Sequence, residues 1–167
     1  MKKIVCVLCI FTGILLTGCS IFTTDKGYTR EELDNLAKLE VYEAGSDKLL
    51  RTIEDEEILY QYNQAAKDSV YVFAEDWEQK EKDLREGAEN AGASYYIVAY
   101  KYPAAKFGNK EPKKYTTIML YQDTNVAKMV LDAGNVKSIA LPEELLTFYY
   151  EMSEEESAFY ESLFEEG

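Results

Sequence analysis

The sequence predicts an α+β fold, in which a small antiparallel sheet packs against helices on one face. Segments that alternate between apolar and polar residues occur in groups separated by short turn sequences. Such grouping is typical of antiparallel sheets, whereas parallel sheets alternate single strands with helices. Helical spacing of apolar residues is found in the middle and at the end of the chain. We expect a hairpin, one or two helices, a meander of three to four strands and C-terminal helices.

A short helix and a hairpin are expected first. Thr29 and Glu32 have the spacing of a capping box, which predicts a short helix over Glu31–Ala37. Alternation over Leu39–Tyr42 and over Leu49–Ile53, with turn residues between them, predicts a β-hairpin.

The middle of the chain predicts two helices. Asp55 is placed to cap the first, whose opening turn is acidic. Its apolar residues share one face: Ile58, Tyr62, Ala65 and Ala66. The second is expected over Ala74–Ala91, with Gly92 as its stop.

The meander is expected to begin with Ser94–Tyr102, which is apolar on both faces and therefore suits a central strand. Tyr115–Tyr121, Val126–Leu131 and Val136–Ala140 are expected to follow as strands. Pro103–Lys114 is expected to be a turn-rich loop.

The C-terminal part is expected to be helical and is acidic. Pro142 followed by two glutamates predicts one helix start. Ser153 and Glu156 form a second capping box, and an apolar stripe follows. Because neither a repeat nor a second linker interrupts the sequence, residues 29–167 are expected to form one domain.

The N-terminus has the pattern of an exported protein. Two lysines precede a mostly apolar run over Ile4–Gly18, which is typical of a secretory signal. The run is shorter than the roughly 20 residues that span a bilayer. It ends in four residues that resemble the lipobox of bacterial lipoproteins at every position: Leu16, Thr17, Gly18 and Cys19.

The resemblance implies that a signal peptidase recognises Leu16, Thr17 and Gly18, removes residues 1–18, and leaves diacylglycerol on the thiol of Cys19. Residues 19–28 are then a short tether to the membrane. This places the domain on the extracytoplasmic face of a bacterial membrane. A Gram-positive cell membrane is favoured, and a Gram-negative envelope is the alternative.

Charge and composition narrow the function classes. The formal net charge is −13, which argues against nucleic acid as a partner because binding it needs a basic surface. The chain has no histidine, and Cys19 is the one cysteine after residue 18. These facts exclude histidine-based and cysteine-based nucleophiles and zinc sites that use histidine. Neither a metal nor a cofactor is expected, and we expect no enzymatic activity.

Two surfaces are candidates for binding a partner. Tyr96, Tyr100 and Tyr102 share one face of the expected central strand, where aromatic residues either bind a glycan or peptide or simply stabilise the sheet. Basic residues also gather in and beside the Pro103–Lys114 loop, and they reverse the local charge of an acidic molecule. These residues are Lys101, Lys106, Lys110, Lys113 and Lys114.

We therefore expect a lipid-anchored, non-enzymatic binding or accessory module. Its partners are the membrane, through the lipid on Cys19, and an unidentified envelope protein or anionic polymer. One alternative is a cell-wall hydrolase that uses carboxylates such as Asp76 or Glu78. Another is an inhibitor or immunity-like protein that acts by strand addition, which requires an edge strand without lysine or proline.

Overall fold

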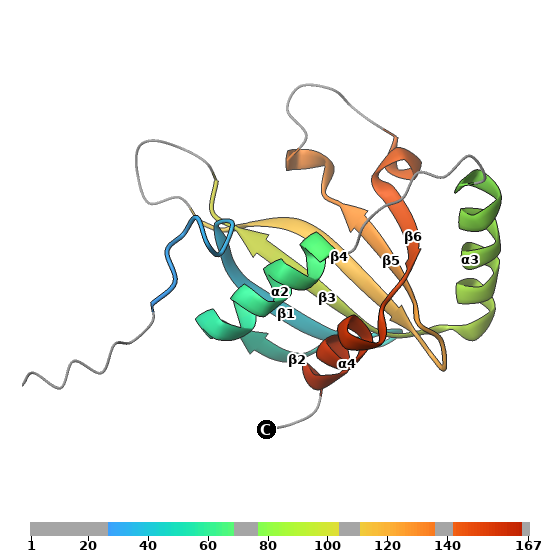
Figure 1. Cartoon of the computed structure of the whole chain (residues 1–167), viewed down its shortest axis with the longest axis horizontal. Helices are drawn as coiled ribbons and strands as arrows, with labels where there is room; N and C mark the ends of the chain where they lie inside the picture. The colour runs from blue at the N-terminus through green and yellow to red at the C-terminus, as the bar shows by residue number, and fades with distance from the viewer. Residues whose placement is uncertain (1–26, 69–76, 104–110, 136–141, 165–167) are drawn as a thin grey trace, which may run out of the picture.

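The computed structural model describes residues 27–68, 77–103, 111–135 and 142–164. They form a six-stranded antiparallel sheet with strand order β2-β1-β3-β4-β5-β6 (Figure 1). The strands are β1 (Leu36–Glu43), β2 (Lys48–Ile53), β3 (Ala93–Lys101), β4 (Lys113–Tyr121), β5 (Val126–Leu131) and β6 (Thr147–Glu151). The helices are α2 (Glu56–Asp68), α3 (Trp77–Ala91) and α4 (Glu154–Ser162), with 3-10 turns η1 (Ala133–Asn135) and η2 (Glu143–Leu146). The predicted α+β fold is confirmed, with a hairpin joined to a four-stranded meander.

The two faces of the sheet belong to two separate apolar clusters. Because side chains alternate along a strand, Tyr150 of β6 enters the main core while its neighbour Tyr149 enters a smaller one. The main core lies under α2 and α4, with Leu39 and Ile97 fully buried at its centre. The smaller core lies under α3, which contacts β5 and β6.

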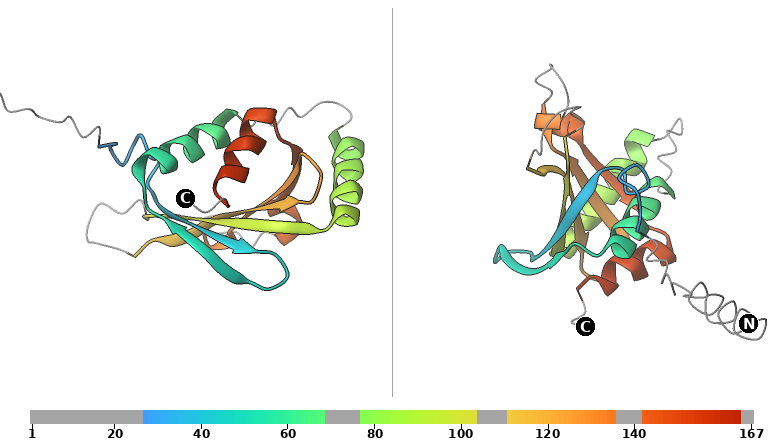
Figure 2. Two further views of the ribbon diagram at one scale, coloured as in Figure 1. Left: turned by 90° about the horizontal axis from the view of Figure 1, so that it is seen from below. Right: turned by 90° about the vertical axis from the view of Figure 1, so that its left-hand side faces the viewer.

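Helices thus occupy both faces of the sheet. α2 and α4 lie on one side, as expected, and α3 stands at the end of the sheet against the opposite side (Figure 2). This corrects the expectation that all helices share one face. The reason is that Ala88 of α3 packs against Tyr121 and Tyr149, which alternation directs away from the main core.

The expected helix over Glu31–Ala37 is wrong. Its capping box is present, since the N–H of Thr29 donates to Glu32 Oε2 at 2.8 Å and the N–H of Glu32 donates to Thr29 Oγ1 at 3.3 Å. However, Asp34 and Asn35 adopt φ angles of 49° and 60°, so the chain makes one turn and enters β1. Residues in the left-handed region of backbone conformation cannot continue a right-handed helix, so the helix ends there.

The two central helices follow the prediction. Asp55 Oδ1 accepts from the N–H groups of Glu57 and Ile58 at 3.0 and 3.1 Å, which caps α2. α3 ends at Gly92, whose φ of 79° is in the left-handed region and whose N–H donates to Ala88 O at 3.2 Å. Residues 74–76 of the expected second helix lie outside the described residues.

The C-terminal part differs from the prediction in one element. The helix expected from Pro142 is only the 3-10 turn η2, and it leads into β6, which the sequence analysis did not predict. Aromatic residues favour a strand here because Tyr149 and Tyr150 are both buried, on opposite faces. The capping box of α4 is confirmed, since Ser153 Oγ accepts from the N–H of Glu156 at 3.1 Å. The expected strand Val136–Ala140 lies outside the described residues.

Candidate functional site

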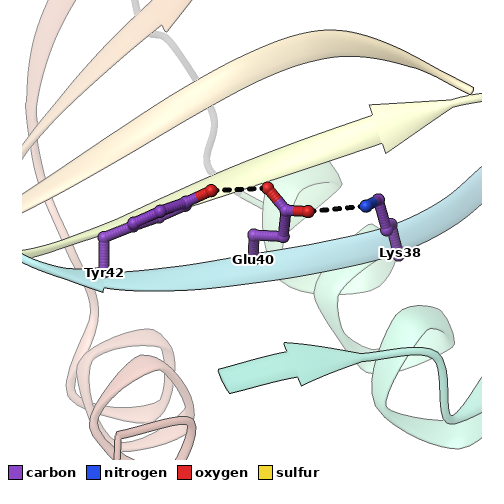
Figure 3. Close-up of polar contacts among 3 residues, drawn as sticks. All are labelled: Lys38, Glu40 and Tyr42. Atoms are coloured by element: carbon purple, nitrogen blue, oxygen red, sulfur yellow. Dashed lines mark hydrogen bonds and ion pairs between the residues drawn. The ribbon is translucent and has the colours of Figure 1, made fainter. Parts of the chain in front are cut away.

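A polar and aromatic cluster lies on the sheet face opposite the main core, on β1. Lys38, Glu40 and Tyr42 alternate along the strand and therefore point to one face (Figure 3). Lys38 Nζ pairs with Glu40 Oε1 at 2.5 Å, and the hydroxyl of Tyr42 donates to Glu40 Oε2 at 2.6 Å. Glu40 is only 9% exposed. Both of its carboxylate oxygens nevertheless have a partner within the protein, as buried polar groups require.

The neighbouring strand β3 completes this cluster. Antiparallel pairing sets Tyr42 opposite Tyr96 and Lys38 opposite Tyr100. The rings of Tyr42 and Tyr96 stack with centroids 4.8 Å apart, and Lys38 Nζ lies 4.7 Å from the ring centroid of Tyr100. The hydroxyl of Tyr96 donates to Asp47 Oδ1 at 2.8 Å. We call these six residues the tyrosine face: Lys38, Glu40, Tyr42, Asp47, Tyr96 and Tyr100.

Burial and hydrogen bonds shift the pKa of Glu40 and of the three tyrosines in the tyrosine face. Burial raises the pKa of Glu40, but hydrogen bonds from Lys38, Tyr42 and Tyr100, with the charge of Lys38, lower it below 4.5 overall. Burial and the hydrogen bond to Asp47 raise the pKa of Tyr96 to about 12. An ionised carboxylate between a cation and phenols suits a structural anchor, whereas a general acid would need a raised pKa.

The position of Glu40 predicts an acid-dependent loss of stability. Because its pKa is lower in the folded chain than the ordinary 4.5, its contribution is complete above 4.5 and is lost as pH falls through the folded value. We expect Glu40→Gln to cost about 1–3 kcal/mol of unfolding free energy at pH 7. Urea denaturation should show this difference shrinking at pH 3.

Glu43→Gln is the matched control, because Glu43 is an exposed glutamate on the same strand. It should change the unfolding free energy by less than Glu40→Gln does at pH 7. A cost of Glu40→Gln that is equal at the two pH values would contradict the role assigned to the carboxylate.

The three tyrosines that were predicted to share one strand face lie in two different places. Tyr96 and Tyr100 share the tyrosine face, and both are partly exposed. Tyr102 lies beyond the end of β3, where its N–H donates to Asn35 O at 2.9 Å and its ring lies 4.5 Å from the guanidinium carbon of Arg30. Sequence reasoning missed four site residues: Lys38, Glu40, Tyr42 and Asp47. Alternation alone puts Lys38, Glu40 and Tyr42 on one face of β1, but only the strand register brings that face to the β3 tyrosines.

The predicted lysines fall at one end of the sheet. Lys101 ends β3 and pairs across the strands with Lys113, the first residue of β4. Lys101 Nζ forms an ion pair with Asp34 and lies 3.8 Å from the ring centroid of Tyr115. Lys113 and Lys114 are exposed and belong to β4, which corrects their assignment to the loop, since the alternating sequence after Lys113 pairs with β3. Lys106 and Lys110 lie outside the described residues.

An open groove lies at the other end of the sheet. Its walls are the β4–β5 turn, the start of β3 and one side of α4. Tyr95 and Phe164 stack in it with centroids 4.3 Å apart. Both polar and apolar side chains line it, among them Asn125, Glu161 and Leu120.

The edge strand β2 bears on strand addition. Leu49 and Leu50 are exposed on it, which would favour pairing with another strand. However, Lys48 and Arg51 flank them, and the register skips Leu50 between Val41 and Tyr42. Basic residues and a bulge are the devices that protect edge strands, so this edge does not show the unprotected character that strand addition requires.

The described residues also bear on metal binding, membrane spans and the two candidate catalytic acids. Among the described residues, no group of three or more histidine, cysteine, aspartate or glutamate side chains is placed to hold a metal ion. None of the helices in the described ranges is long and apolar enough to cross a membrane. Glu78 is exposed on α3, and Asp76 lies outside the described residues.

Comparisons with protein-family models, curated proteins and solved structures found no match for this chain.

Proposed function

We propose that this protein is a lipid-anchored, extracytoplasmic binding module whose tyrosine face contacts its partner. The lipid is the diacylglycerol on Cys19 that the lipobox Leu16-Thr17-Gly18-Cys19 implies. The observation that carries the binding role is an ordered set of aromatic and charged groups on a sheet face that stays partly exposed. Tyr42, Tyr96 and Tyr100 each retain solvent exposure.

The arrangement supports binding because its side chains are already fixed. Stacking of Tyr42 on Tyr96 and the hydrogen bonds to Glu40 and Asp47 remove rotamer freedom before a partner arrives. Preorganised side chains lose less entropy on association, and tyrosine is enriched at interfaces because it offers both apolar area and a hydroxyl. The partner chemistry that fits is a peptide or glycan segment of the envelope.

Photo-crosslinking from the tyrosine face tests this function. Benzoylphenylalanine replaces Tyr100 in the full-length chain, an aromatic exchange, and cells are irradiated before their envelopes are solubilised. The control places the same residue at Gln61, which is exposed on α2 on the other side of the sheet.

We expect a discrete adduct from position 100 that is absent from position 61 and is weakened by Tyr96→Ala. An adduct of twice the protein's mass would identify a second copy as the partner. The same adducts from both positions, or none from position 100, would remove the tyrosine face as the binding surface.

A further inference from the structure

The point at which the chain enters the domain is fixed by contacts. The ring of Tyr28 stacks on Tyr60 of α2 with centroids 4.5 Å apart, and its N–H donates to Glu56 Oε2 at 3.1 Å. Its hydroxyl donates to the carboxylate of Glu57. Asn63 Nδ2 donates to Glu32 O at 2.9 Å and holds the next turn on the same helix. Residues 28–35 are thus attached to one end of the molecule.

Two exposed lysines of the sheet, Lys113 and Lys114, lie at this same end, together with the half-buried Lys101. Leu36, the first residue of β1, pairs with Lys101, and Lys101 pairs with Lys113. The ion pair of Lys101 with Asp34 and the hydrogen bond from the N–H of Tyr102 to Asn35 O join the entering chain to the end of β3. We name Lys101, Lys113 and Lys114 the lysine end.

Chain length limits how far the lysine end lies from the bilayer. The nine residues from Cys19 to Tyr28 reach at most about 30 Å when fully extended. β4 runs from Lys113 to Tyr121, about 27 Å at the usual rise of a strand. Contact of the opposite end with the membrane would therefore require a nearly straight tether folded back along the domain, which costs conformational entropy.

Charge favours the same orientation. Lys113 and Lys114 are exposed, and Arg30 lies nearby over Tyr102. Asp34 is paired with Lys101. Glu111 lies beside these lysines, and the other exposed acids of this end belong to the entering turn and to the start of α2: Glu31, Glu32, Glu54, Asp55, Glu56 and Glu57. The opposite end carries Glu43, Asp47, Asp123 and Glu151 with Lys48 among them, and an anionic surface repels this excess of acids.

We infer that the lysine end contacts anionic lipid headgroups of the membrane that holds Cys19. In this orientation the strands run roughly perpendicular to the membrane plane, and the tyrosine face points parallel to it. This inference rests on the lipid anchor of the proposed function. Lysines close to an anionic leaflet add attraction that decays within about a Debye length, so they act only once the anchor has brought them near.

Fluorescence quenching measures this orientation in the full lipidated chain. A reporter cysteine replaces Glu111, which is exposed beside the lysine end, or Gln122, which is exposed in the β4–β5 turn at the other end. Each is labelled with a fluorophore, because lipid occupies the thiol of Cys19. The protein is inserted into vesicles of phosphatidylcholine and phosphatidylglycerol in equal parts, or of phosphatidylcholine alone, each with a headgroup nitroxide quencher.

On the anionic vesicles we expect the Glu111→Cys label to be quenched at least about two-fold more than the Gln122→Cys label, with a smaller difference on neutral vesicles. In the Glu111→Cys background, Lys113→Gln with Lys114→Gln should reduce the preference for this orientation roughly 25-fold, since each lysine near the surface contributes about a five-fold change. The matched control, Lys80→Gln with Lys82→Gln on α3, removes equal charge from exposed positions and should have no effect.

Equal quenching at the two reporters overturns the inference while leaving the anchor intact. Quenching that is unchanged by the Lys113 and Lys114 substitutions does the same. Vesicle flotation separates the two claims. A full chain that carries no lipid and does not float overturns the anchor, and the orientation with it.

Discussion

Cys19→Ala is expected to abolish both lipid attachment and the cleavage that depends on it. Intact mass spectrometry of the wild-type protein should give a chain that begins at residue 19 and carries diacylglycerol, whereas the variant should keep residues 1–18 and gain no lipid mass. The effect is large because two acyl chains are lost together. One chain alone gives a reversible membrane binding constant of only about 10⁴ M⁻¹, whereas two chains give stable anchoring.

A second form of the variant isolates the anchor from the apolar signal. When a cleavable secretory signal without a lipobox replaces residues 1–18 and Cys19→Ala is present, the exported domain should leave the membrane fraction. An unmodified Cys19 in the wild-type protein, or a domain that stays with membranes in this form, would contradict the anchor.

Leu39→Ala is expected to cost about 3–5 kcal/mol of unfolding free energy. Leu39 is 0% exposed and lies in β1 between Ile53 of β2 and Ala99 of β3, so the surrounding sheet cannot close the cavity that alanine leaves. Small domains are stable by about 5–15 kcal/mol, so the variant loses a large share of its stability. Urea denaturation followed by circular dichroism measures the change.

Leu145→Ala is the matched control, because it makes the same substitution in a side chain that is 62% exposed. It should change the unfolding free energy by no more than about 0.5 kcal/mol. Equal losses for the two leucines would show that Leu39 is not at the centre of the main core.

Two capping boxes in this chain show what a local signal can predict. Both Thr29 and Ser153 cap the turn that follows them. Only the second starts a helix, because Tyr160 of α4 and Leu163 at its C-cap are buried in the main core. After Thr29, by contrast, Asp34 and Asn35 adopt left-handed φ angles and the chain enters a strand. A cap sets the start of a helix, and burial of an apolar face decides whether it continues.

Pairing between distant strands explains what the sequence did not reveal. Alternation alone placed Tyr96 and Tyr100 on one face of a central strand, and the structure agrees. Their contacts with Lys38 and Tyr42 depend on the register between β1 and β3, which are separated by two helices. β6 was missed for the same reason, since its aromatic residues become strand residues only beside β5 and between two cores.

On the sheet face opposite the main core, α3 covers one end and leaves the other end uncovered (Figure 2). Beneath α3, Val126 of β5 and Tyr149 of β6 belong to the smaller core, while their neighbours Ala127 and Tyr150 belong to the main core. Along β1 and β3, one side of each strand holds the main core while the other side holds the tyrosine face. Under the proposed function, substitutions at positions 38, 42, 96 and 100 would alter what this domain recognises while its main core keeps the same residues. The proposed recognition surface and the main core thus use opposite sides of the same two strands, and Glu40 is the residue of the tyrosine face that also contributes to stability.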